Sequence, residues 1–391
     1  MNTSYFADLH IHIGRTSKNQ AVKITASDKL TMPSILEYAK NEKGLHIVGV
    51  IDCHSPGVLE DLNTLIRAGK MRQDENGGIL TNDGLLLVMG SEIEIYDEWC
   101  SGPIHVLCYF PTLDTMGKFS RWLEKRVTNI HLSSQRVYAS GRELQTFVKE
   151  LGGLFIPAHI FTPFKSLYGK GVKQSLQEVF DPKLIDAVEL GLSSDTEMAY
   201  QIQEIRKYAF LTNSDAHSLP KLAREYQKVQ MKELNFKELV WAIKGQNGRL
   251  IEANYGLNPR IGKYHQTVCA ECFQHVANVE LPCPSCGHTR IVKGVKDRIL
   301  ELSFSDEEKP VSKPPYIHQV PLENLPGIGP KLLHKLVLTF GNEMNVLHYA
   351  TKDELIKVAG EKVCSYILAA RNGTLHFNAG GGGRYGKVSD K

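Results

Sequence analysis

Histidine and carboxylate side chains recur at the ends of short apolar runs through the N-terminal part of the chain. The first run ends in His10 and His12, and alternation along a strand places both imidazoles on one face. Later runs carry the same residue types at their ends. Asp52-Cys53-His54, Glu92-Ile93-Glu94 and Pro157-Ala158-His159 close three runs, His105 begins another, and Ser214-Asp215-Ala216-His217 follows a further one. The repetition, rather than any single motif, indicates that these side chains share one site.

The chemistry that these residue types favour is metal binding. Imidazoles and carboxylates are ligands of first-row transition metals, and a site that contains both suits Zn, Mn or Fe. Burying this much titratable charge without a metal would be costly. In a parallel barrel the carboxyl ends of the strands meet at one rim, where active sites form. We therefore expect a multinuclear metal site at that rim.

Four of the eight cysteines form two pairs of the type Cys-x-x-Cys, with ten residues between the pairs. Such pairs supply four thiolates with the spacing of a tetrahedral zinc site. Protein ligands would fill all four positions, so the expected site is structural and holds one Zn. A disulfide-bonded knot is the alternative. The four ligands are Cys269, Cys272, Cys283 and Cys286.

Two glycine-containing stretches near the C-terminus resemble the hairpins of helix-hairpin-helix motifs. The first contains Gly327, Gly329 and Lys331, and a weaker copy contains Gly360 and Lys362. Glycine lets backbone N–H groups approach a phosphate at the N-terminus of the next helix, where the helix dipole favours an anion. The pattern predicts a DNA-binding tail, with a helical dimerisation domain as the alternative.

Composition and charge are compatible with this assignment. The chain has 391 residues, 42% hydrophobic and 23% charged, as in soluble proteins of two or three domains. No apolar run approaches the ~20 residues of a membrane helix, and no signal peptide is visible, so we expect a cytoplasmic protein. The net charge is +3, but residues 313–391 carry ten basic and six acidic side chains, which favours a polyanionic partner. Arg384, in a glycine-rich end that is either disordered or DNA-binding, is a further candidate contact.

The elements that must position these residues alternate between strands and helices, which predicts a largely parallel α/β barrel. The expected strands are Tyr5–His12, His46–Ile51, Leu85–Ile95, His105–Tyr109, Gly153–Pro157, Ala187–Leu190 and Phe210–Asn213. The expected helices include Met32–Asn41, Gly141–Leu151, Thr196–Tyr208 and Asn235–Lys244. We divide the chain into a barrel (1–258), a zinc-ribbon module (259–302), a linker (303–318) and a small all-α domain with a glycine-rich end (319–391).

The order of the histidine and acidic motifs resembles that of the PHP superfamily over residues 1–255. This resemblance implies a distorted seven-stranded β/α barrel that holds two or three divalent metals (Zn, Mn, Fe or Mg) in a phosphoesterase site. It further implies that Glu92, Asp215 and His217 are catalytic, and that either Asp52 or His54 is a ligand. A further histidine that many members carry after the first pair is absent here, which leaves a third metal open. The full set of implied ligands is His10, His12, Asp52, His54, Glu92, His105, His159, Asp215 and His217.

A barrel of this kind, a zinc ribbon and a hairpin tail in one chain resemble the endonuclease Q family. The resemblance implies a DNA repair endonuclease that cuts 5′ to a deaminated base (uracil, hypoxanthine or xanthine) or to an abasic site. The lesion base would be flipped out of the duplex. The implied partners are DNA and replication or repair proteins, with no membrane, and the protein would associate with the nucleoid in a prokaryote. The alternatives are a phosphatase of small phosphate monoesters and a non-catalytic DNA-binding scaffold.

Overall fold

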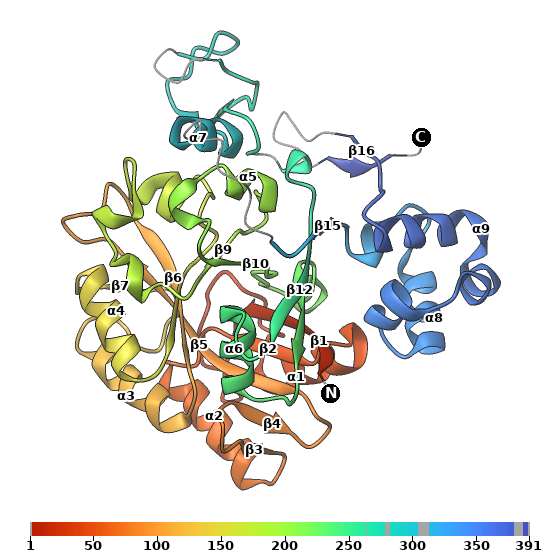
Figure 1. Ribbon diagram of the computed structural model, residues 1–391, viewed down its shortest axis with the longest axis horizontal. Helices are drawn as coiled ribbons and strands as arrows, with labels where there is room; N and C mark the ends of the chain where they lie inside the picture. Colours follow the sequence, from red (N-terminus) through yellow and green to blue (C-terminus); the bar gives the residue numbers. More distant parts are fainter. Residues whose placement is uncertain (1, 263, 278–281, 304–312, 379–385, 390–391) are drawn as a thin grey trace.

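The computed structural model describes residues 2–262, 264–277, 282–303, 313–378 and 386–389. Seven strands follow one another around a ring in its largest part (Figure 1). These strands are β1 (Thr3–Ile11), β2 (Ile47–Val50), β5 (Leu86–Ile95), β6 (Ile104–Phe110), β8 (Leu154–Pro157), β9 (Ala187–Glu189) and β10 (Ala209–Leu211). The prediction of an α/β fold is confirmed, and each of the seven expected strands is present within a few residues of its predicted bounds.

One strand of the ring runs against its neighbours, and at two places the ring is closed by hydrogen bonds outside the regular strand pairs. β1, β2 and β5 are parallel, whereas β6 is antiparallel to both β5 and β8. The Ile160 N–H donates to the Glu189 carbonyl at 2.9 Å, which joins β8 to β9. The Ala216 N–H donates to the His10 carbonyl at 3.1 Å, which joins the segment after β10 to β1. The carboxyl ends of most of these strands therefore meet at one rim.

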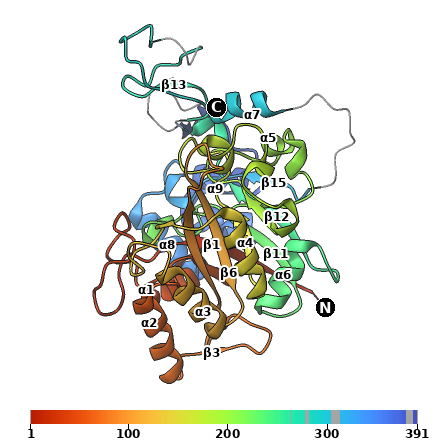
Figure 2. The same ribbon diagram turned by 90° about the vertical axis from the view of Figure 1, so that its left-hand side faces the viewer.

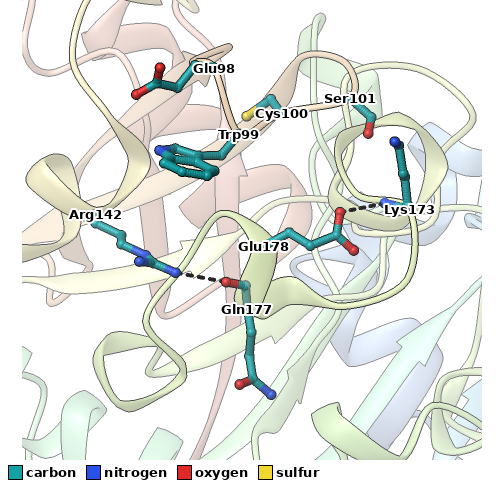
Figure 3. Close-up of a pocket in the computed structure, with 8 residues that line it drawn as sticks. All are labelled: Glu98, Trp99, Cys100, Ser101, Arg142, Lys173, Gln177 and Glu178. Atoms are coloured by element: carbon teal, nitrogen blue, oxygen red, sulfur yellow. Dashed lines mark hydrogen bonds between the residues drawn. The ribbon is translucent and has the colours of Figure 1, made fainter.

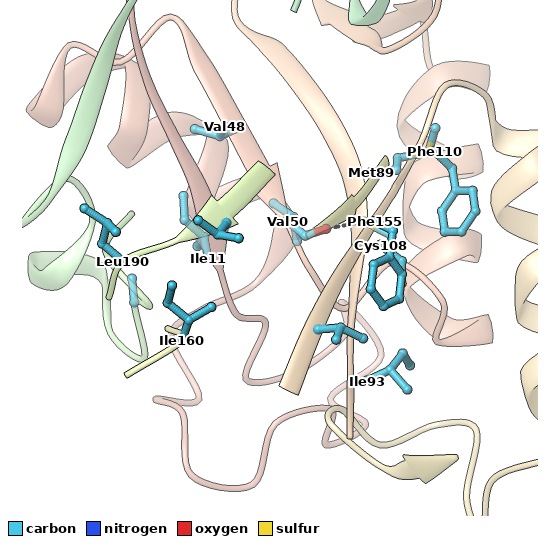
Figure 4. Packing of buried hydrophobic residues seen from close by; sticks show 14 of the residues in the cluster. Ile11, Val48, Val50, Met89, Ile93, Cys108, Phe110, Phe155, Ile160 and Leu190 are labelled. Atoms are coloured by element: carbon cyan, nitrogen blue, oxygen red, sulfur yellow. Dashed lines mark hydrogen bonds between the residues drawn. The ribbon is translucent and has the colours of Figure 1, made fainter. Parts of the chain in front are cut away.

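Apolar side chains line both faces of the central strands. Leu87 and Met89 of β5 belong to one hydrophobic cluster, and Leu86 and Val88 belong to another. Figure 4 shows part of the first cluster, in which Val50, Met89, Cys108 and other side chains from neighbouring strands pack together. Strands that are buried on both faces carry continuous apolar runs, which is why these segments were recognisable in the sequence.

Helices cover the outside of the ring, and polar residues fix where they begin (Figures 1 and 2). Thr112 begins α3 by accepting a hydrogen bond from the Thr115 N–H, and Thr31 caps α1 in the same way with Ser34. The helices of this part are α1 (Met32–Tyr38), α2 (Pro56–Arg67), α3 (Leu113–Glu124), α4 (Gly141–Glu150), α5 (Thr196–Tyr200) and α6 (Phe236–Lys244). Further strands extend the sheet: β3 (Met71–Gln73), β4 (Ile79–Thr81), β7 (Arg136–Val137), β11 (Tyr226–Met231) and β12 (Leu250–Gly256).

One predicted helix is much shorter than expected. The sequence predicts a single helix over 196–208, but α5 ends at Tyr200 and a separate 3-10 turn covers Gln203–Ile205. Ile202 between them has the non-helical angles φ −93° and ψ 105°. The Arg206 guanidinium donates to the Tyr200 carbonyl at 2.8 Å, so a side chain replaces a helical N–H at that carbonyl.

The cysteine-rich module lies above the ring, next to α7 (Val295–Leu302) (Figure 1). Its two short strands, β13 (Val268–Cys269) and β14 (Ile291–Val292), are antiparallel. Arg298 attaches α7 to the main body, because its guanidinium donates to the carbonyls of Tyr168, Val172 and Lys173 at 2.7–3.0 Å. The module is therefore anchored by a charged side chain that satisfies carbonyls outside regular structure.

The C-terminal helices, α8 (Pro330–Phe340) and α9 (Lys352–Arg371), form a separate layer with its own apolar core. A short strand, β15 (Tyr316–His318), leads into this layer and pairs in parallel with β12. It lies within the segment predicted as a linker, of which 304–312 fall outside the described residues. A last pair of strands, β16 (Phe377–Asn378) and β17 (Lys387–Val388), ends the described chain.

Buried polar contacts dock this C-terminal layer on the ring. The Lys43 ammonium lies 2.8 Å from a Glu343 carboxylate oxygen, and both side chains are buried. Tyr226 donates its hydroxyl proton to His348 Nε2 at 2.7 Å, and the His348 ring stacks on Phe6. Gly44 has a φ of +80° and leaves room for Asn342, because a Cβ at Gly44 would lie 2.3 Å from the Asn342 side-chain oxygen. Among the described residues, no helix is long and apolar enough to cross a membrane.

Candidate metal centre

Glu92, near the end of β5, is the centre of the polar cluster at the rim. One of its carboxylate oxygens, Oε1, lies 3.6 Å from His10 Nε2, 2.8 Å from His105 Nδ1 and 3.4 Å from His159 Nε2. The other oxygen, Oε2, lies 3.6 Å from His12 Nε2. The strand ends thus bring four histidines from distant parts of the sequence around a single carboxylate.

Asp215 closes the cluster from the loop after β10. Its Oδ1 lies 3.5 Å from His10 Nε2 and 3.6 Å from His12 Nε2, and the loop also carries His217. The backbone at Asp215 and at His159 has positive φ values of 47° and 32°, a strained conformation that aims both side chains at the cluster. The Asp215 side chain is 33% exposed and that of His10 is fully buried, so the cluster opens toward Asp215.

Several nitrogens in this cluster are buried without a hydrogen-bond partner among the described residues. They are Nε2 of His10, His12 and His105, and Nδ1 of His159. A buried polar atom of this kind is costly unless something binds it. Three groups of potential ligand atoms lie close together: His10 with His12 and Glu92; Glu92 with His105 and His159; and His12 with Asp215 and His217. This donor set fits divalent metal ions, and Glu92 can bridge two of them because it belongs to two groups.

The charges in the cluster keep its carboxylates ionised. Burial alone would raise the pKa of Glu92, but the charges of His105 and Lys23 hold its pKa well below the usual value. Burial likewise opposes ionisation of Asp215, and its neighbours His10 and His12 hold its pKa well below the usual value. A carboxylate must be deprotonated to bind a metal, so both groups are in the required state.

Two further carboxylates orient the first pair of histidines. His10 Nδ1 donates to Glu189 Oε1 at 2.9 Å, and Glu189 also accepts from the Asn213 side chain at 2.8 Å. His12 Nδ1 donates to Asp52 Oδ2 at 3.1 Å. In both histidines the hydrogen bond leaves Nε2 as the ligand atom. Sequence reasoning missed Glu189 and Asn213; the available signal was an acidic residue at the end of an apolar strand.

A cavity of about 220 Å³ lies directly beside the cluster. His159 and Asp215 belong to its wall, together with Asn213, Arg224 and Tyr264. The Arg224 guanidinium also donates to the carbonyls of Ser214 and Asp215, which fixes the loop that carries Asp215. The cavity thus gives an organic group access to the predicted ligands from the exposed side.

A larger and shallower hollow of about 770 Å³ lies elsewhere on the surface (Figure 3). Its lining includes the exposed Trp99 and two short polar contacts, from Arg142 to the Gln177 carbonyl and from the Lys173 N–H to Glu178. None of the predicted metal ligands lines it. We therefore locate the chemistry at the smaller cavity.

Comparison with known proteins agrees with this geometry. No family model matches the chain. It is 54% identical over 383 residues to the uncharacterized protein YqxK of Bacillus subtilis, which covers 98% of both chains. It is also similar to the crystal structure of the lesion-specific endonuclease PfuEndoQ of Pyrococcus furiosus, with a TM-score of 0.85, 34% identity, and coverage of 99% of this chain and 95% of that one. The chain belongs to the endonuclease Q family.

A second structure of endonuclease Q contains DNA. It holds a 27-mer duplex substrate with an abasic lesion at the active site, and it matches this chain with a TM-score of 0.84 and 33% identity. The match covers 100% of this chain and 97% of that one. The similarity to the endonuclease Q structures therefore extends through the cysteine-rich module and the C-terminal helices as well as the ring.

In this member of the endonuclease Q family, Asp52 and His54 have different surroundings. Asp52 accepts hydrogen bonds from His12 Nδ1, the Ile13 N–H and the Ser133 hydroxyl, so it acts on the cluster through His12. His54 Nδ1 contacts the Ser91 hydroxyl at 2.7 Å, and its Nε2 lies 3.4 Å from the Leu132 carbonyl. Neither residue belongs to a group of potential ligands within the described part of the chain.

The four cysteines of the second predicted site come together as expected. Cys269 Sγ lies 3.6 Å from Cys286 Sγ, and Cys272 Sγ lies 3.6 Å from Cys283 Sγ. Four thiolates at 2.3 Å from a tetrahedral zinc would be about 3.8 Å apart. The cluster fits a structural zinc. Cys53 and Cys108 are buried near the ring, and burial raises the pKa of both thiols, which makes them poor nucleophiles.

The two predicted hairpins lie in the C-terminal layer. Gly327 has a φ of +86° and precedes α8, where Gly329 is the N-cap. Gly360 has a φ of +81° and interrupts α9 with a non-helical residue. These glycines, Lys331 and Lys362 are all exposed. A Cβ at Gly327 would lie 3.0 Å from the Val363 side chain, so the two hairpins are neighbours. Arg384 falls outside the described residues.

Proposed function

We propose that this protein is a metal-dependent DNA repair endonuclease that hydrolyses the phosphodiester 5′ to a deaminated base or an abasic site. The observation that carries the proposal is the pair of buried, unpartnered Nε2 atoms of His10 and His12, each 3.6 Å from a Glu92 oxygen and next to a cavity open to solvent. Its similarity to PfuEndoQ, a lesion-specific endonuclease, and to endonuclease Q with abasic DNA supports this choice of substrate.

The residues divide into two ligand groups and a set that positions them. His10, His12 and Asp215 with Glu92 would hold one divalent ion, and His105 and His159 with Glu92 would hold a second. Divalent ions held by these two groups would supply an activated water and neutralise charge on a phosphoryl oxygen. Asp52 and Glu189 keep His12 and His10 in the tautomer that presents Nε2. Asp215 and His217, on the open side, face the incoming phosphodiester.

The cavity beside Asp215 is the place for the lesion nucleotide in this proposal. Its volume of about 220 Å³ suits one nucleoside that has left the base stack, and Arg224, Asn213 and Tyr264 offer hydrogen-bond donors and an aromatic face. A base that is paired inside a duplex hides the edge that distinguishes a deaminated base. A pocket next to the metals therefore accounts for recognition and cleavage at one nucleotide.

In this proposal the C-terminal hairpins bind DNA, and the cysteine-rich module has a structural role. The hairpins at Gly327–Gly329 and Gly360 would present backbone N–H groups to phosphates of the duplex, with Lys331 and Lys362 beside them. The four cysteines would hold one structural zinc. The proposed units are 1–258 for catalysis, 259–302 for the zinc module and 319–391 for DNA binding.

The test uses end-labelled duplexes with a single uracil, hypoxanthine or abasic site, incubated with the protein and Mg²⁺ or Mn²⁺. We expect one metal-dependent cut on the 5′ side of the lesion and none in an undamaged duplex. Cleavage of a phosphate monoester such as p-nitrophenyl phosphate, without cleavage of lesion DNA, would replace the proposal with a phosphatase. Binding of lesion DNA without any cleavage would indicate a scaffold.

Asp215→Asn is the first variant to measure, because it removes the charge on the open side of the cluster. We expect it to lower the cleavage rate at least about 1,000-fold while DNA binding changes little. Asp114→Asn is the matched control, since Asp114 pairs with Lys118 on the surface of α3. An Asp215→Asn protein that cuts as fast as the unaltered protein would contradict the role of Asp215.

A further inference from the structure

Lys23 points a positive charge into the metal centre from the loop between β1 and α1. The Lys23 N–H donates to the Ile13 carbonyl at 2.9 Å, which holds this loop against the end of β1. Its side-chain ammonium lies 3.3 Å from Glu92 Oε2 and donates to the Ser134 hydroxyl at 2.5 Å. The side chain is 14% exposed. A lysine therefore shares the central carboxylate with the histidines.

A lysine side chain that is only 14% exposed needs partners that compensate for its lost hydration. Removing an ammonium from water is costly unless charged or polar partners replace the water. Glu92 and Ser134 are such partners, but Glu92 is also the carboxylate that both ligand groups share. An ammonium has three N–H donors, and these contacts use two of them. The third donor and the partial exposure leave Lys23 able to reach a group that enters the centre.

The third group of potential ligands cannot complete a metal site of its own. It consists of His12, Asp215 and His217. His12 Nδ1 is engaged by Asp52, so only Nε2 is available, and that atom already belongs to the group around Glu92. Asp215 and His217 alone are too few to hold a third ion. The protein itself supplies a further positive charge next to Glu92, the ammonium of Lys23.

The positive charge of Lys23 also affects other ionisable groups of the cluster. Burial lowers the pKa of His217, and the positive charges of His12 and Lys23 lower it further. The charge of Lys23 also opposes protonation of His12 and of Asp52. The ammonium thus influences both the first ligand group and the open side where Asp215 and His217 lie.

We propose that Lys23 is a catalytic residue, whose ammonium takes the place of a third cation beside two metal ions and binds a non-bridging oxygen of the scissile phosphate. The inference rests on the proposed function, because it assumes a phosphodiester substrate. Lys23 forms a charge-assisted hydrogen bond and transfers no proton. The positive charge would hold the phosphate before cleavage and stabilise the charge that develops on it during cleavage.

The test compares three variants in the full-length protein. Lys23→Met keeps the aliphatic stem and removes the charge, and Lys23→Arg keeps a charge. Lys18→Met is the matched control, because Lys18 lies in the same loop and its ammonium pairs with Glu60 on the surface. Each protein is loaded with Mn²⁺, and its metal content, its affinity for inorganic phosphate and its cleavage of uracil-containing DNA are measured.

We expect every variant to retain two Mn²⁺ ions besides the metal of the four cysteines. Lys23→Met should bind inorganic phosphate about 10- to 100-fold more weakly, as expected for the loss of one charged hydrogen bond. Its kcat on lesion DNA should fall about 100- to 1,000-fold, whereas Lys23→Arg should recover most of both losses. Lys18→Met should behave like the unaltered protein in all three measurements.

Three results would overturn the inference. Unchanged phosphate affinity in Lys23→Met would show that the ammonium does not touch the anion. Loss of a metal ion from Lys23→Met would show that the lysine only supports Glu92. A third ion at Asp215 and His217 of the unaltered protein would remove the need for a lysine cation. If the unaltered protein binds phosphate through Lys23 but does not cut lesion DNA, the proposed function fails and the anion site stands.

Discussion

At the scale of single residues, the ligand types were predictable and their supports were not. His10, His12, Glu92, His159 and Asp215 could be named as candidate ligands because each lies at or after the end of an apolar run. His105 could be named because it begins the next such run. Glu189 and Lys23 could not be named, since an acid or a lysine in a sequence says nothing about which distant side chain it contacts. Their roles depend on contacts with His10 and Glu92 that only the folded ring creates.

Glu189 provides a test of how much these supporting contacts contribute. Glu189→Gln preserves the shape of the side chain but replaces the acceptor for His10 Nδ1 with a neutral group. We expect metal affinity to fall about 10- to 100-fold, as is typical when the orienting partner of a metal-ligating histidine is changed. Competition with a chelator measures the affinity. Glu178→Gln is the control, because Glu178 accepts only backbone N–H groups far from the cluster. Equal metal affinity in both variants would contradict an orienting role for Glu189.

At the scale of elements, the strands were predicted well because their apolar runs are continuous. The helix expected from Thr196 to Tyr208 was wrong in its second half, and the reason is tertiary. Arg206 binds the carbonyl of Tyr200, and the turn at Ile202 lets both Ile202 and Ile205 enter the core. Helical periodicity over such a short stretch does not distinguish one helix from a helix followed by a turn.

Gly360 tests the hairpins in the C-terminal layer. Gly360→Ala places a Cβ on a residue with positive φ, in a space with no atom within 4 Å, so only the backbone conformation is penalised. Its φ of 81° and ψ of 165° lie in a region that residues other than glycine rarely adopt, so we expect a loss of about 1–3 kcal/mol in stability and a several-fold weaker affinity for duplex DNA. Gly152→Ala is the control, since Gly152 has a φ of +70° and equal space in the ring part. It should lose similar stability, measured by urea unfolding, with unchanged DNA affinity. If the two variants bind DNA equally, the hairpin does not contact it.

At the scale of the whole molecule, the position of the C-terminal layer depends on contacts that sequence motifs do not encode. Phe6, Tyr226 and His348 come from three distant segments and form one buried aromatic contact. Motifs could predict that a helical tail exists, but not that a histidine and a lysine–glutamate pair would attach it to the ring. That attachment fixes where the C-terminal layer lies relative to the ring.

His348 makes this attachment sensitive to pH. Burial, with Lys228 and Arg371 nearby, lowers the pKa of His348 to about 3. A histidine whose pKa is lower in the folded than in the unfolded protein takes up its proton on unfolding, so stability falls as the pH drops below the unfolded pKa of about 6.5. We expect a loss of about 2 kcal/mol between pH 7 and pH 5 from this group. Urea unfolding at several pH values measures the free energy of unfolding of the unaltered protein and of His348→Phe. The slope of this free energy against pH should differ between the two proteins. The same pH dependence of stability in both proteins would contradict a contribution from His348.

The short strand β15 protects one edge of the sheet in the ring part. It covers the free side of β12, so three residues from beyond the cysteine-rich module occupy an edge that would otherwise offer unpaired N–H and carbonyl groups. A protein truncated after α7 would expose this edge to other copies of itself. Such a fragment should self-associate through β12 more strongly than one extended to His318, which keeps the paired edge, and light scattering of the two fragments would measure the difference.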